Sequence, residues 1–151
     1  MHRHGSYARY RQPTGDEQFA VQRFLCRPCG HTVSVLPANR LTYRPLEVKQ
    51  IQAHFDAQAE DGQAEVSSGL DPPPDAITAG CLQRAWNRFL TRVEALKTAF
   101  GQMLPAVIST PQHLWQQLRQ CVGTAEEMLR FLARHGKRSL LGDYACLKPA
   151  P

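Results

Sequence analysis

The clearest periodic pattern in the sequence is helical and covers residues 79–100. Six large apolar residues lie four, three, four, three and four positions apart: Leu82, Trp86, Phe89, Val93, Leu96 and Phe100. Because an α-helix has about 3.6 residues per turn, this spacing puts all six on one side of a single helix of about six turns. Thr78 is a suitable N-cap residue, and Gly101 follows the expected end.

Three shorter stretches also have helical spacing, over residues 46–58, 111–121 and 124–135. Thr124 followed by two acidic residues predicts a capped helix start, since the acids complement the helix dipole. We expect the apolar sides of all these helices to form the core of a small bundle. A hydrophobic tail is expected to pack back on it through Leu140, Leu141, Tyr144 and Leu147.

Several single residues receive a structural interpretation from these helices. Trp86 and Trp115 are expected in the core rather than as platforms on which bases stack. Cys81 and Cys121 lie on apolar helical sides and are expected to be buried. His54 is the only histidine of its helix, and we expect it at the surface.

The first 36 residues favour short strands instead. Residues 7–11, 19–25 and 32–36 are rich in aromatic and β-branched residues, and the last of these runs alternates regularly. Pro13-Thr14-Gly15-Asp16 is a turn sequence between the first two runs. These patterns predict a three-stranded antiparallel ribbon with a cysteine-containing turn between its second and third strands.

Together the patterns predict an α+β fold, in which a short antiparallel β-ribbon precedes a small, mainly α-helical bundle. We expect a ribbon with one helix over residues 1–58, a linker or long loop over residues 59–76, and the bundle over residues 77–151. The linker is rich in Pro, Gly and Ser, and regular structure does not run through consecutive prolines such as Pro72-Pro73-Pro74.

Charge is distributed unevenly along the 151 residues. Residues 1–55 contain eight Lys and Arg against three acids, residues 56–80 contain six acids and no base, and residues 81–151 contain ten bases against four acids. The formal net charge is +5, which favours a polyanionic partner. With 42% hydrophobic residues the chain can form a core. No run approaches the roughly 18 apolar residues of a membrane span, and a secretory signal is not apparent. We therefore expect a cytoplasmic protein.

Cys26 and Cys29 form a Cys-x-x-Cys-Gly turn, which has the shape of a zinc knuckle. Gly30 can adopt the positive φ that this turn requires. A structural zinc needs four ligands, and we take His2 and His4 as the other two, since the ribbon brings the first strand's start towards the turn. The alternatives are a half-site that has lost its metal, or a site completed by residues outside this chain.

Three motifs in this order carry a resemblance to a known family: HGSYARYR over residues 4–11, RFLCRPCGHTVSVLP over residues 23–37 and LTYR over residues 41–44. They resemble the zinc-ribbon segment of bacterial insertion-sequence transposases, and a related family of small proteins of unknown function. Those proteins carry another Cys-x-x-Cys before the HG motif, so the resemblance implies a degenerate or N-terminally truncated ribbon here. Their catalytic domain has no counterpart after residue 55, and no catalytic residues are carried over.

The sequence therefore predicts a noncatalytic DNA-binding protein related to the N-terminal part of a transposase. Seven arginines are the expected phosphate contacts: Arg9, Arg11, Arg23 and Arg27 in the ribbon, and Arg84, Arg88 and Arg92, one turn apart, on the long helix. The alternatives are a helical protein-interaction or assembly module, which could form homo-oligomers through its helices, and an inactive transposase remnant.

Overall fold

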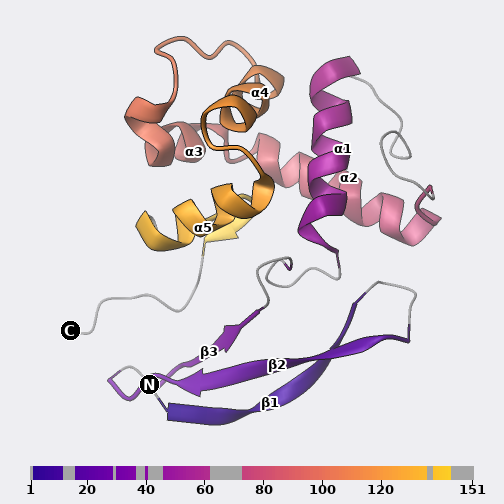
Figure 1. The fold of residues 1–151 in the computed structure, drawn as a ribbon, viewed down its shortest axis with the longest axis vertical. Coiled ribbons are helices and arrows are strands. Elements are labelled where there is room, and N and C mark those ends of the chain that lie inside the picture. The colour runs from indigo at the N-terminus through magenta and orange to yellow at the C-terminus, as the bar shows by residue number, and fades with distance from the viewer. Residues whose placement is uncertain are drawn as a thin grey trace.

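The structure is a computed structural model that describes residues 2–11, 16–28, 30–36, 40, 46–61, 73–135 and 138–143. The predictions made for Cys29, Tyr144 and Leu147, and for most of the expected linker, lie outside these residues. Within them, a body of helices lies on one side of a β-sheet, which forms a layer of its own (Figure 1).

The sheet contains β1 (His2–Tyr10), β2 (Gln18–Leu25) and β3 (Thr32–Val35), antiparallel and in that order. This confirms the predicted ribbon. The turn between β2 and β3 is closed by two backbone hydrogen bonds, from Gly30 N to Cys26 O at 2.9 Å and from Cys26 N to His31 O at 2.8 Å. Gly30 has the expected positive φ, 68°.

The pairing of β1 with β2 is interrupted near the start of β1. Arg3 lies opposite Phe24, but Gly5 lies opposite Arg23, so His4 is an extra residue on β1. Such a bulge reverses the alternation of side chains along the strand. Gly5 has φ 111°, a conformation that glycine adopts at little cost.

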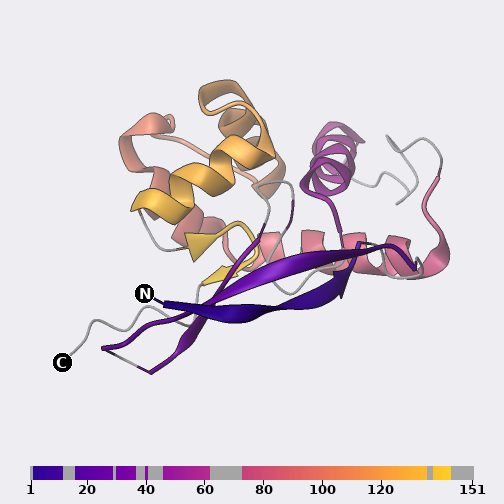
Figure 2. The ribbon, with the colours of Figure 1, turned by 60° about the horizontal axis from the view of Figure 1, so that its bottom comes forward.

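The helical body comprises α1 (Val48–Asp61), α2 (Ala76–Leu90), α3 (Val93–Phe100), α4 (Pro111–Cys121) and α5 (Ala125–His135). A short 3-10 helix, η1 (Gly101–Met103), follows α3, and a separate two-stranded hairpin of β4 (Arg138–Ser139) and β5 (Gly142–Asp143) follows α5. Figures 1 and 2 show that α1 and α2 cross at a steep angle. The sheet followed by helices confirms the α+β fold.

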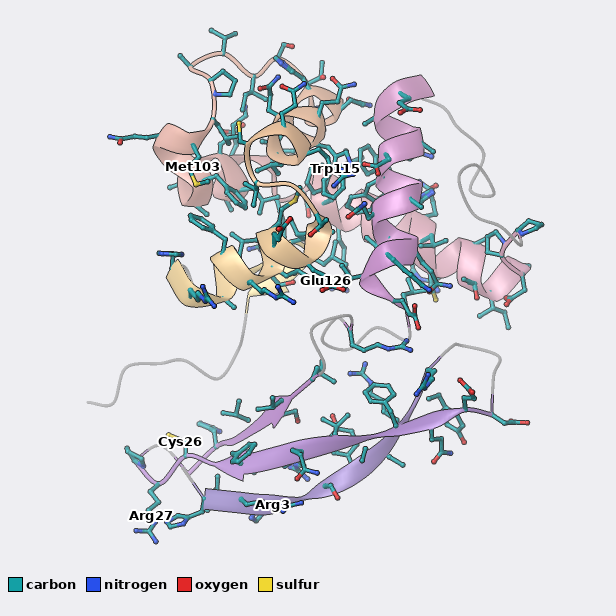
Figure 3. The ribbon with its side chains drawn as sticks, in the orientation of Figure 1. Arg3, Cys26, Arg27, Met103, Trp115 and Glu126 are labelled. Atoms are coloured by element: carbon teal, nitrogen blue, oxygen red, sulfur yellow. The ribbon has the colours of Figure 1, made fainter. Side chains whose placement is uncertain are left out.

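Four aromatic rings occupy the centre of the helical body. Phe55 of α1 contacts Trp86, Phe89 and Trp115, with ring centroids 4.9, 5.2 and 5.0 Å apart. Both tryptophans are buried, as predicted. Figure 3 shows Trp115 of α4 next to α1. α1, expected in one unit with the ribbon, packs in the core of the bundle, because its apolar side meets α2, α4 and α5.

The long helix predicted over residues 79–100 is two helices. α2 ends at Leu90, and Arg92 has φ −110° and ψ 3°, outside the helical region. The hydroxyl of Thr91 donates to the carbonyl of Arg88 at 2.8 Å, a local bond that competes with helix continuation. Leu82, Trp86, Phe89, Leu96 and Phe100 are all buried, so the apolar pattern is satisfied on both sides of the break.

Helix ends follow local chemistry, with one difference from prediction. Thr124 caps α5, donating its hydroxyl to Glu127 at 2.8 Å and accepting from Glu127 N at 3.2 Å, as expected of a capping box. The expected cap Thr78 is instead inside α2. Asp75 caps this helix and accepts from Ile77 N and Thr78 N, because a carboxylate accepts from two backbone donors at once.

Two predictions about burial are wrong. Cys121 is exposed, because Val122, four residues after the buried Leu118, takes the inward position and packs against the core, whereas Cys81 is half-buried. His54 is fully buried rather than at the surface. It shares with Gln58 a side of α1 that is covered although it is polar. By contrast, Leu140 and Leu141 are buried in the core, as predicted.

One arginine connects the sheet to the helical body. Arg40 is buried, and its guanidinium lies 5.2 Å from the centroid of the Phe19 ring on β2. It also donates to the carbonyl oxygen of Arg11 and forms a 2.9 Å ion pair with Glu47, just before α1. The face of the sheet that carries Phe19 is therefore the inner face, turned towards the helices.

Candidate nucleic-acid interface

Strand register assigns each side chain of the ribbon to the inner or the outer face. Residues directly opposite one another share a face, so Arg9, opposite Phe19, is on the inner face. Arg23 lies two residues beyond the inward Val21 and is on the inner face too. Phe24 is outward, and Arg3 opposite it is therefore outward. The four arginines predicted in the ribbon thus do not form one outward patch.

Arg9 and Arg11 gather around Arg40 at the junction with the helices. Arg9 is half-buried, and Arg11 forms an ion pair with Glu17 at 3.6 Å. Desolvation lowers the pKa of Arg40, Glu47 opposes this effect, and the charges of Arg11 and Arg9 lower the pKa further. This end of the ribbon therefore uses part of its positive charge within the protein.

The opposite end of the ribbon is cationic and has no acid in its sequence. Residues 2–11 and 18–36 contain no Asp or Glu. Six basic residues gather in the rows next to the β2–β3 turn, which we call the cationic tip: His2, Arg3, His4, Arg23, Arg27 and His31. Figure 3 shows Arg3 and Arg27 at this end, with Cys26. Glu17 lies six residues before Arg23, or about 20 Å along an extended strand, well beyond the screening length of about 8 Å at physiological salt.

The arginines of the cationic tip make hydrogen bonds to neutral groups. Arg3 Nε donates to Gln22 Oε1 at 3.0 Å, and Arg23 donates to the Thr32 hydroxyl at 2.8 Å while lying 5.9 Å from the Tyr7 ring centroid. Arg27 is exposed. In the described part of the chain none of these three forms an ion pair, although Arg23, on the inner face, is half-buried.

The three arginines predicted on one long helix are separated by the break at Thr91. Arg84 and Arg88 are exposed on α2, whereas Arg92 is half-buried at the start of α3. Arg84 also donates to Cys81 Sγ at 3.1 Å. A continuous ridge with one charge per turn is therefore wrong, and α2 presents two cations.

The described residues include only three of the four expected zinc ligands, Cys26, His2 and His4. His2 pairs with Leu25, the residue before Cys26, so the start of β1 does approach the turn, as expected. His4 is the extra residue of the bulge, and both histidines are exposed. Among the described residues, no three His, Cys, Asp or Glu side chains form a group that could hold a metal. Because Cys29 lies outside them, zinc binding by Cys26, Cys29, His2 and His4 stays a prediction.

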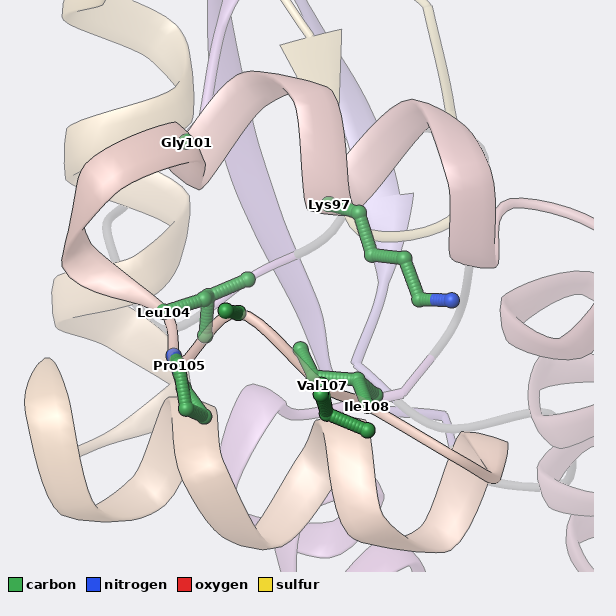
Figure 4. A pocket seen from close by; sticks show the side chains of 7 residues that line it. Lys97, Gly101, Leu104, Pro105, Val107 and Ile108 are labelled. Atoms are coloured by element: carbon green, nitrogen blue, oxygen red, sulfur yellow. The ribbon is translucent and has the colours of Figure 1, made fainter.

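Two shallow pockets lie on the helical body. The larger, about 420 Å³, is lined by Lys97, Gly101 and apolar residues of the loop up to Ile108 (Figure 4). The Nζ of Lys97 forms a 2.9 Å ion pair with Glu94. The smaller, about 290 Å³, lies between α1 and α4, where Asp56 accepts from Trp115 Nε1 at 2.8 Å and Arg119 Nε at 3.1 Å. Lys97 in the larger pocket, and Asp56 and Arg119 in the smaller one, therefore already have partners.

Sequence analysis missed Arg3 and Gln22 as site residues. Strict alternation along β1 puts Arg3 on the same face as Arg9, and only the bulge at His4 moves it outward. The one signal in the sequence is Gly5, whose position inside a strand pattern is typical of a bulge.

No family model matches the chain, and no curated protein or solved structure is significantly similar to it. None of the helices in the described ranges is long and apolar enough to span a membrane.

Proposed function

We propose that the protein is a noncatalytic DNA-binding protein and that the cationic tip is its main contact with the phosphate backbone. The observation that carries the proposal is the set Arg3, Arg23 and Arg27, three arginines at one end of the ribbon that have no carboxylate partner in the described ranges. Arginine presents several donors in a planar fork that matches phosphate oxygens. Arg84 and Arg88 on α2 supply a second, weaker region of positive charge.

The resemblance of residues 4–44 to transposase zinc ribbons supports the same function. We infer from it a relation to the N-terminal part of such a transposase. The cytoplasmic location expected from the sequence is part of this proposal.

Salt dependence of binding tests the proposal. Full-length protein is titrated into a labelled duplex of random sequence between 50 and 200 mM salt. Three phosphate contacts give a slope of log affinity against log salt near about −2.7, and an affinity loss of about 40-fold over this range. Substituting Arg3, Arg23 and Arg27 together by Ala is expected to remove most of the binding. Arg134→Ala on α5 is the control, because it removes an exposed charge far along the chain from the tip.

Two results would overturn the proposal. One is the absence of binding to any duplex at 50 mM salt. The other is binding that neither salt nor the triple substitution weakens, while circular dichroism shows all variants folded.

The alternative function is a helical protein-interaction module. It is supported by the exposed loop beside the larger pocket, where Met103 is 41% and Val107 is 76% exposed. If this loop mediates self-association, sedimentation shows a concentration-dependent dimer that Val107→Ser dissociates. A monomer at every concentration would contradict homo-oligomer formation through this loop.

A further inference from the structure

We propose that the outer face of β1 and β2 reads base edges in the major groove of duplex DNA, with Arg3 and Gln22 as the specificity-determining residues. This inference rests on the proposed function, and goes beyond the phosphate contacts of the cationic tip by assigning sequence-specific binding to two named side chains.

Arg3 and Gln22 form a hydrogen-bonded pair on the outer face of the sheet. Arg3 Nε donates to Gln22 Oε1 at 3.0 Å across the two strands. Gln22 lies opposite Ser6 and two residues along β2 from Phe24, the partner of Arg3, so all three share the outer face. The bond uses the Nε donor of Arg3 and leaves the two terminal Nη groups of its guanidinium to donate to a ligand. It also leaves the amide NH₂ group of Gln22 and one lone pair of its Oε1, which is the acceptor that an adenine N6–H needs.

The guanidinium of Arg3 and the amide of Gln22 match the polar groups of base edges. A guanidinium bonds bidentately to O6 and N7 of guanine, and a glutamine amide to N6 and N7 of adenine. Because Gln22 already holds Arg3 in one orientation, less side-chain freedom is lost when a base is bound. Arg3 is exposed, and Ser6 beside it adds a hydroxyl that donates or accepts.

The outer face of β1 and β2 is the face that a DNA duplex can reach. The inner face is turned to the helical body through Arg40, so the outer face is the one away from it. β1 is an edge strand, and paired strands lie about 4.8 Å apart. The major groove, about 12 Å wide, admits such a two-stranded ribbon. At the rows of Arg3 and Gln22 the sheet also contains β3, which pairs with Gln22 to Leu25, so the duplex has to be approached from the free edge of β1.

The charge of the outer face is compatible with an approaching duplex. The outward residues of the three strands include Arg3 and no acid. Nothing on this face repels the phosphates that border the groove, whereas the inner face lies next to Glu17 and Glu47 at the junction.

Selection from a pool of random duplexes with full-length protein tests the inference. The selected duplex is then compared with a scrambled duplex of the same composition, at one salt concentration. Arg3→Lys keeps the charge but loses the fork, and Gln22→Ala loses the amide. Each is expected to lower the ratio of selected to scrambled affinity by about 5- to 150-fold, the worth of one bidentate base contact. Arg27→Ala removes a phosphate contact only, so both affinities fall in parallel and the ratio stays within about twofold of the wild-type value.

The outcomes separate this inference from the proposed function. If random duplexes bind with steep salt dependence but no sequence is enriched, base reading is wrong and phosphate binding stands. If a sequence is enriched and Arg3→Lys and Gln22→Ala both leave the ratio unchanged, other residues read the bases and the assignment is overturned. If no duplex binds at low salt, the proposed function fails and this inference fails with it.

Discussion

Replacing His54 by Leu is expected to make the protein more stable. His54 is 0% exposed, and neither Nδ1 nor Nε2 has a hydrogen-bond partner among the residues that the structure describes. A buried polar group that has lost its partners costs about 1–3 kcal/mol. Leucine is apolar and of similar size, so His54→Leu removes this cost and is expected to raise the free energy of unfolding by about 1–3 kcal/mol. For a domain of this size, that is a rise in Tm of about 2–12 °C.

The same substitution is expected to change how stability depends on pH. Burial lowers the pKa of His54 from its ordinary value of 6.5. Below that pH the unfolded chain binds a proton that the folded protein does not, so the stability gained from the neutral ring is present above pH 6.5 and is lost as the pH falls towards the folded-state pKa. The loss is at most about 1.4 kcal/mol per pH unit for one group. His54→Leu should lack this part of the slope.

Urea denaturation of wild type and His54→Leu at several pH values between 5 and 8 measures both effects. His31→Leu is the control, because it replaces an exposed histidine and reports the general effect of an added leucine. The reasoning is refuted if His54→Leu is less stable than wild type at pH 7.5, or if the difference between the two does not grow as the pH falls.

Three further predictions concern the core and the cysteine turn. Phe55→Ala is expected to lower the free energy of unfolding by about 3–5 kcal/mol, because the ring contacts three other aromatic residues; a loss below about 1 kcal/mol by urea titration would contradict the packing. A fragment of residues 46–151 should melt cooperatively by calorimetry, whereas residues 76–151 lack α1 and should not; equal melts would show that α1 is dispensable. Protein purified without added zinc should carry at most one zinc per chain by elemental analysis, and Cys26→Ala/Cys29→Ala none; equal zinc in both would exclude the turn as the site.

The sequence by itself determined the elements whose patterns are local. Residues 111–121 form a helix with the predicted bounds, since Thr110 caps it and Pro111 suits its first turn. The capping box at Thr124 is likewise a short-range signal, and it fixes the start of α5. Alternation and a Gly-containing turn were enough to predict the ribbon and the positive φ of Gly30. At the helix starts and in the turn, the hydrogen bonds join residues a few positions apart.

Only the tertiary structure decided features that depend on distant pairing. The apolar pattern over residues 79–100 is satisfied equally by one helix or by two that meet at Thr91, because both bury the same side chains. His54 is buried because the polar side of α1 is covered in the folded chain, which periodicity does not show. The outward position of Arg3 follows from one extra residue in β1, since a shift of one position reverses the face of every side chain beyond it. Of the two residues to which we assign base reading, Arg3 is therefore the one that strict alternation places on the wrong face.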